Sequence, residues 1–157
     1  MLKRTAICAL SALLLGAIVT SDASAQDPAE RFGEWWLDGN TPPPAVNIMT
    51  YEPWGDGGMS ITVRATNARG QESEWGYNTL FDGVFRAVQG QEGSETAVEW
   101  VNERTTRILN ARNGEVTQII INTLSEDGQT IENEYIRMDS DGKPTSVGRA
   151  TYRRIDN

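Results

Sequence analysis

The feature that most constrains the fold is a series of glycines at nearly constant spacing. They form two series, thirteen residues apart in the first and fourteen in the second: Gly57, Gly70 and Gly83, then Gly114, Gly128 and Gly142. Most follow Asp or Asn, and such pairs accept the positive φ angles of tight hairpin turns. The spacing leaves about ten residues between turns, which fits one strand each time.

The segments between these glycines alternate apolar and polar residues, as half-buried strands do. The stretch 59–66 carries its apolar side chains at odd positions, and 73–81 does the same with aromatic ones. The span 83–114 is about twice as long and is expected to hold two or three strands. With a first strand at 33–37 and a last one at 148–155, we predict nine or ten strands.

This rhythm predicts an all-β domain, an antiparallel up-and-down meander closed into a β-barrel of about 8–10 strands. A meander of that length twists, and closure removes the free edges that would otherwise pair with other chains. An open two-sheet sandwich is the alternative. The steady hairpin spacing, with no long crossover connections, favours the barrel.

The first 25 residues have the three parts of a secretory signal peptide. Lys3 and Arg4 precede an apolar run at 6–19, and the small residues Ala23-Ser24-Ala25 form a cleavage site. The run is shorter than the roughly 20 residues that a membrane span requires. We therefore expect cleavage after residue 25, a polar leader at 26–32, a barrel domain at 33–157, and a periplasmic or secreted protein.

The composition excludes several kinds of chemistry. The chain has no histidine, and its one cysteine, Cys8, lies in the predicted signal peptide. Cys/His metal sites and Ser-His-Asp or Cys-His catalysis are therefore ruled out for the mature chain. We predict no cofactor, no metal site and no enzyme activity. Carboxylate chemistry stays open through two acidic pairs, whose alternative reading is solvated charge on the outer face: Glu72 with Glu74, and Glu132 with Glu134.

The charge of the mature chain argues against nucleic acid as a partner. Residues 26–157 carry 12 Lys or Arg and 21 Asp or Glu, and an acidic chain repels phosphate backbones. The outward-facing positions of the predicted strands are polar, so we expect a barrel that does not span a membrane. The sequence leaves the oligomeric state open.

Five stretches together resemble a group of small secreted bacterial lipocalin-like (calycin) domains: GEWWLD, MTYEPWGDG, VEWVNERTTRILNARNGEV, TLSEDGQTI and ATYRR. Lipocalins share a Gly-x-Trp in the first strand, matched here by Gly33 and Trp35. The resemblance implies that Trp35 plugs one end of the barrel and that Arg154 stacks over it, with Arg153 as the alternative. Trp36 would point the other way.

A barrel of this size is either filled by its own side chains or hollow enough for one small ligand. The residues that we expect to line its interior are Met59, Ile61, Val63, Trp75, Tyr77, Phe81, Trp100, Ile120 and Tyr135. If the barrel is hollow, the protein binds a small lipophilic molecule. If it is filled, the protein is an envelope interaction or accessory protein. Trp36 and Trp54 are candidates for a mouth or partner contact, and Trp54 precedes a glycine-rich turn where no strand is expected.

Overall fold

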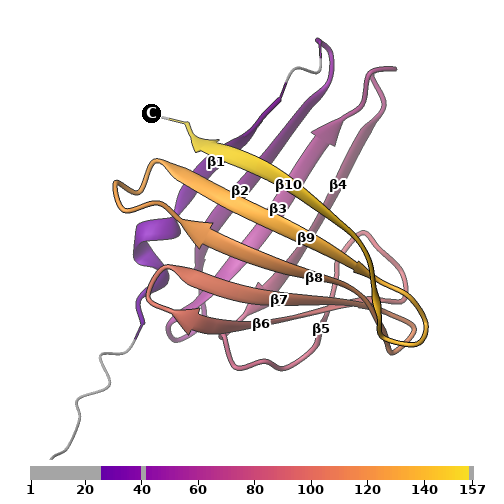
Figure 1. Cartoon of the computed structure of the whole chain (residues 1–157). Helices are drawn as coiled ribbons and strands as arrows, with labels where there is room; N and C mark the ends of the chain where they lie inside the picture. The colour runs from indigo at the N-terminus through magenta and orange to yellow at the C-terminus, as the bar shows by residue number, and fades with distance from the viewer. Residues whose placement is uncertain (1–25, 40–41, 156–157) are drawn as a thin grey trace, which may run out of the picture.

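Ten antiparallel strands form one continuous sheet that curls into a barrel (Figure 1). The structure is a computed structural model that describes residues 26–39 and 42–155, so the predicted signal peptide lies outside the described residues. The strands are β1 (Gly33–Asp38), β2 (Val46–Trp54), β3 (Gly58–Thr66), β4 (Glu72–Thr79), β5 (Arg86–Ala87), β6 (Ser94–Asn102), β7 (Thr105–Arg112), β8 (Glu115–Leu124), β9 (Thr130–Met138) and β10 (Pro144–Arg154).

Each strand pairs with its neighbours in sequence except at the junction of β4 and β5, and β1 also pairs with β10. The sheet order is therefore β4-β3-β2-β1-β10-β9-β8-β7-β6-β5. This is the up-and-down meander that the turn spacing predicts, and the all-β barrel is confirmed. Within the described residues, no helix is long and apolar enough to cross a membrane.

The barrel closes between β4 and β5 by a short contact. Gly76 and Gln89 exchange two backbone hydrogen bonds, of 3.1 and 2.8 Å. Two glycines allow this approach, because a Cβ on Gly76 would lie 2.5 Å from the carbonyl oxygen of Ile61, and one on Gly90 would lie 2.5 Å from that of Glu74. Since β5 has only two residues, the barrel is nearly rather than fully closed.

All six glycines of the two predicted series have positive φ, between 68° and 84°. Five lie in hairpin turns, and Gly83 lies in the loop between β4 and β5. The prediction of hairpin turns is confirmed at these five positions and is wrong at Gly83, whose positive φ serves a loop instead.

Two details differ from the strand pattern expected from the sequence. Residues 46–54 form β2, and Trp54 is its last residue, opposite Gly58. The expectation that no strand includes Trp54 is therefore wrong. Pro53 obscures the pattern, but the strand tolerates it near its end. The second difference concerns Phe81, which was expected in the same strand as Trp75 and Tyr77. β4 ends at Thr79, and Phe81 follows in a loop with φ of 57° while its side chain stays buried.

The segment before β1 is part of the barrel. Residues Pro28–Arg31 form a short 3₁₀ helix, η1, whose first backbone amides are capped by Asp27 through a 2.9 Å bond to Ala29 N. The segment 26–32 is polar in composition, as predicted. The prediction of a polar leader did not include burial, and yet the Arg31 side chain is only 2% exposed.

Candidate ligand-binding cavity

Trp35 blocks one end of the barrel, which we call the closed end. Its side chain is fully buried, and its Nε1 donates a 2.9 Å hydrogen bond to the carbonyl oxygen of Arg31 in η1. Its ring lies 6.5 Å from that of Tyr51, centroid to centroid. The first strand and the segment before it are thereby fixed together across the closed end.

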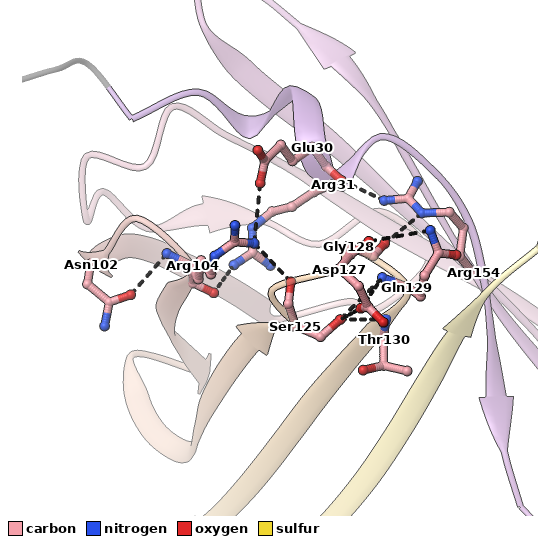
Figure 2. A network of polar contacts seen from close by, with 10 residues as sticks. All are labelled: Glu30, Arg31, Asn102, Arg104, Ser125, Asp127, Gly128, Gln129, Thr130 and Arg154. Atoms are coloured by element: carbon pink, nitrogen blue, oxygen red, sulfur yellow. Dashed lines mark hydrogen bonds and ion pairs between the residues drawn. The ribbon is translucent and has the colours of Figure 1, made fainter.

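Arg154, at the end of β10, stacks over Trp35. Its Cζ lies 4.2 Å from the centre of the indole ring, within cation–π range. The guanidinium also donates to the carbonyl oxygens of Gly128 at 2.9 Å and Glu30 at 2.6 Å (Figure 2). A third bond, of 2.7 Å, goes to the carbonyl oxygen of Phe32. One side chain therefore joins the first strand, the last strand, the segment before β1 and the β8–β9 turn.

Gly33 and Arg153 complete the arrangement that the resemblance implies. Gly33 has φ of 126°, and a Cβ at this position would lie 3.2 Å from Nη1 of Arg154. Arg153 points outward and pairs with Asp38 at 2.6 Å. Of the two arginines considered, Arg154 is the one that covers Trp35.

Arg31 adds a buried cation above the closed end. Its guanidinium donates to Oδ1 of Asn122 and, at 2.6 Å, to the carbonyl oxygen of Arg104, and it lies 5.5 Å from the ring centre of Trp100. Burial lowers the pKa of Arg31. The sequence offered no signal for this role, because a single arginine in a polar stretch has no periodicity.

Beyond Arg31 the barrel contains a cavity of about 360 Å³, which lies in the range of about 300–1,000 Å³ typical of ligand sites. Six of the nine residues predicted to line the interior border it: Ile61, Val63, Trp75, Tyr77, Ile120 and Tyr135. The other three, Met59, Phe81 and Trp100, belong to the packed core instead. Phe81 and Trp100 stack with ring centroids 4.5 Å apart. Whether the six residues contact a ligand stays a prediction.

All four tyrosines of the chain border this cavity. The hydroxyls of Tyr135 and Tyr152 lie 3.5 Å apart, and that of Tyr51 makes a weak 3.7 Å contact with the sulfur of Met49. The hydroxyl of Tyr77 has no hydrogen-bond partner among the described residues. Burial raises the pKa of Tyr51 to about 12 and also raises the pKa of Tyr77 and of Tyr152. These three phenols therefore stay protonated at neutral pH and can donate.

Two buried asparagines connect Arg31 to the cavity wall. Asn122, which accepts from Arg31, donates to Oδ1 of Asn133 at 2.7 Å, and Asn133 donates to the Tyr135 hydroxyl at 3.1 Å. Sequence reasoning missed both. The signal was available, because Asn122 lies at an inward position of β8, two residues beyond Ile120.

The end of the cavity away from Trp35, which we call the mouth, is polar and carries a net positive charge. The charged residues that border the cavity are Arg112, Arg137 and Glu95. Neither arginine forms an ion pair within the part of the chain that the structure describes. This lining contrasts with the net charge of −8 of the whole chain.

Trp36 and Trp54 are half-exposed, at 38% and 37%, and neither borders the cavity. Trp36 lies on the outer face of β1 beside a shallow groove that also includes Val46 and Ala65. Trp54 is the last residue of β2 and lies toward the closed end, since Tyr51, three residues before it, pairs with Gly33. It therefore does not guard the mouth. A partner contact at either tryptophan stays a prediction.

The two acidic pairs lie on the outer surface of the barrel. Glu72 and Glu74 are exposed on β4. Glu132 accepts a 2.9 Å bond from the Thr151 hydroxyl, and Glu134 pairs with Arg149 at 2.7 Å. This placement corresponds to solvated outer-face charge, and it puts these carboxylates on the opposite side of the sheet from the cavity.

Together the meander, the Trp35–Arg154 contact and the cavity define a lipocalin-like (calycin) up-and-down barrel. No family model matches the sequence, and no curated protein matches it. Among solved structures, the wild-type fluorescent protein UnaG is similar, with a TM-score of 0.57 and 9% sequence identity over 82% of this chain and 99% of that chain. An alanine mutant of UnaG has the same TM-score and coverage at 10% identity. At this identity the likeness concerns the fold.

Proposed function

We propose that this protein binds a small lipophilic molecule in the cavity of its barrel. The observation that carries the proposal is the cavity of about 360 Å³ between the closed end and the mouth. Its wall combines aliphatic and aromatic side chains with a few hydroxyl and amide groups, the composition typical of small-molecule sites. A filled barrel, the basis of the alternative function, would not leave this space.

We propose further that the protein acts in the bacterial periplasm or outside the cell, as a member of the small secreted lipocalin-like group. The features of residues 1–25 and the quoted stretches support this location. N-terminal sequencing of the protein from a periplasmic extract tests it, with Gln26 expected as the first residue. Protein found only in the cytoplasm and still starting at Met1 would contradict it.

An envelope interaction protein remains the second candidate because of one cluster of exposed apolar side chains. Leu80, Val84 and Phe85 are 40%, 53% and 38% exposed in the loop after β4. The β2–β3 turn that follows Trp54 adjoins this loop, since a Cβ on Gly58 would lie 2.7 Å from Cδ2 of Leu80. Exposed apolar patches mark interaction sites. A partner here would be compatible with a ligand in the cavity.

The test of cavity binding is a titration with N-phenylnaphthylamine, a neutral lipophilic fluorophore whose emission rises in apolar surroundings. Ile120 borders the cavity and is only partly buried, so Ile120→Trp places an indole in the space that a ligand would occupy. Val147→Trp, on the outer face of β10 at a 59% exposed position, is the matched control. We expect wild type and V147W to bind the fluorophore and I120W to lose binding at least tenfold.

Equal binding by all three proteins would place the fluorophore on the surface and refute cavity binding. Circular dichroism and the melting temperature of each variant check that the barrel is intact.

A further inference from the structure

Most of the exposed apolar side chains of the barrel lie together at one corner of the closed end. Within the described residues, eight large hydrophobic side chains are exposed. Five of them, between 37% and 57% exposed, form a group that we call the apolar corner: Trp54, Leu80, Val84, Phe85 and Val101. Exposed apolar groups that lie together mark interaction sites, because contact with a partner removes them from water.

Trp54 and Leu80 are brought together by a glycine. Trp54, the last residue of β2, pairs with Gly58 on β3. A Cβ on Gly58 would lie 2.7 Å from Cδ2 of Leu80, so the leucine occupies the space that a side chain at position 58 would fill. The two apolar residues therefore lie close to one another, although they come from different hairpins.

The loop between β4 and β5 joins this pair to β6. The amide of Gly83 in the loop donates a 3.0 Å hydrogen bond to the carbonyl oxygen of Val98. Val84 and Phe85 follow Gly83 directly, and Val101 lies three residues along β6 from Val98. The apolar corner is therefore one surface built from three segments of the chain, and it forms only in the folded barrel.

The loop is fixed in the conformation that exposes Val84 and Phe85. The carboxylate of Asp82 accepts two 2.7 Å hydrogen bonds from the guanidinium of Arg86 and one of 3.1 Å from the amide of Val84. Phe81 has φ of 57°, a conformation that costs a residue with a side chain about 1–3 kcal/mol. A loop that is already ordered loses little conformational entropy when a partner binds to it.

The free charges around the apolar corner are negative. Glu52 and Asp56 lie two residues before and after Trp54, and Glu103 lies two residues after Val101. All three carboxylates are exposed, and none forms an ion pair within the described residues. The basic side chains of the same segments are each paired with another carboxylate, and they are Arg86, Arg104 and Arg107.

This distribution of charge favours a basic partner over the other occupants of such a surface. A second copy of the chain in a two-fold dimer would bring the same carboxylates face to face. An anionic membrane surface would be repelled. A basic protein gains complementary charges around an apolar contact, which steers and orients its binding. The net charge of −8 of the whole chain acts in the same direction at longer range.

We propose that the apolar corner binds a partner protein through a segment in which apolar side chains lie next to arginines or lysines. This inference rests on the second candidate function, an interaction protein, and adds the chemistry of the partner. The corner lies at the closed end, so the mouth of the cavity stays accessible while the partner is bound.

The experiment is photo-cross-linking in the protein's own cells from Phe85→p-benzoylphenylalanine, an analogue that keeps the phenyl ring. The same analogue at Val147, which is 59% exposed on the outer face of β10, is the control. Position 85 is expected to give a product with one partner protein. Mass spectrometry of the digested product is expected to place the link in a segment with apolar residues next to arginine or lysine. Position 147 is expected not to give this product.

Two double variants test the role of charge. Asp56→Asn with Glu103→Gln removes two carboxylates of the corner at nearly constant size and is expected to reduce the yield of the product at least about fivefold. Glu72→Gln with Glu92→Gln removes two exposed carboxylates toward the mouth and is expected to leave the yield within about twofold, because salt screens distant charges. Circular dichroism checks that every variant keeps the barrel.

The outcomes separate the inference from the function on which it rests. A partner segment without basic residues, the same product from position 147, or equal yields from the two double variants would overturn the inference alone. Products with only a second copy of the chain, products with only lipid, or no product from position 85 would contradict both. The fluorophore titration reports on the cavity and is independent of all these results.

Discussion

The two ends of the barrel differ in how they use their polar groups. At the closed end, Arg154 makes three hydrogen bonds to backbone carbonyls and covers the ring of Trp35, whose own N–H is also bonded. In the cavity, the hydroxyl of Tyr77 has no partner among the described residues, and Arg137 forms no ion pair there. The polar groups at the closed end are therefore hydrogen-bonded within the fold, whereas some of those that border the cavity are not.

This difference indicates where stability and binding reside. A group that is fully bonded within the fold contributes to the free energy of unfolding, and its removal leaves former partners unsatisfied. A group that is buried without a good partner contributes little to stability and is available to a ligand. Substitutions at the closed end are therefore expected to affect stability, and those in the cavity to affect binding.

The largest effect is expected at Trp35. Trp35→Ala removes a fully buried indole, its hydrogen bond to Arg31 and its contact with Arg154, and is expected to lower the free energy of unfolding by about 3–5 kcal/mol. Its neighbour on the other face of β1 is the control, because Trp36 is 38% exposed. Urea denaturation of both variants measures the difference. Equal losses would show that Trp35 is not the centre of the closed end.

The next largest loss in the free energy of unfolding is expected at Arg154. Arg154→Ala leaves three carbonyl oxygens without a donor and uncovers Trp35, so a loss of about 2–4 kcal/mol is expected. Arg153→Ala, one position earlier, breaks only an exposed ion pair with Asp38 and should cost about 0–1 kcal/mol. The same denaturation assay compares them. A larger loss for R153A would reverse the assignment of the two arginines.

Alkaline pH tests the buried phenols. Tyr51 has an ordinary pKa near 10 in the unfolded chain and about 12 in the folded one, so the unfolded state loses its proton first. The contribution of Tyr51 is therefore complete below about pH 10 and is lost as pH rises through about 12, at about 1.4 kcal/mol per pH unit. Tyr51→Phe should show a shallower decline of stability over this window. Identical slopes would mean that the hydroxyl is solvated.

The smallest effect is expected at Tyr77. Tyr77→Phe removes a hydroxyl that has no partner in the described residues and keeps the ring, so the free energy of unfolding should change by less than about 1 kcal/mol. Thermal melting at neutral pH without added ligand checks this. A loss above about 2 kcal/mol would mean that the hydroxyl is bonded within the fold, which would remove its availability for a ligand.

The strand pattern and the closed end could be predicted from the sequence because they depend on local signals. Turn glycines need positive φ, and strand alternation puts Ile61 and Val63 inside. The resemblance to lipocalin-like proteins added Trp35 and Arg154. The prediction that no strand includes Trp54 was wrong. Pro53 and the glycine-rich turn after Trp54 are both unfavourable to strands, and they hid the strand that ends there.

The inner end of the cavity could not be predicted in the same way, because it depends on contacts between distant segments. Arg31 and Asn122 are 91 positions apart, and no local pattern relates them. The depth of an inward side chain is also not a local property. Met59 and Ile61 occupy the same face of β3, yet only Ile61 borders the cavity. Alternation assigns a face, but the position along the barrel axis separates packed core from cavity wall.

The most direct test of binding in the cavity is native mass spectrometry of the mature protein after incubation with an extract of its own cells. Wild type is expected to carry an adduct on the order of a few hundred daltons, the size of ligand that such a cavity holds. I120W, with an indole in the space that the ligand would occupy, is expected to appear at its bare mass. Spectra in which wild type and I120W are alike, both bare or both with the same adduct, would contradict binding in the cavity.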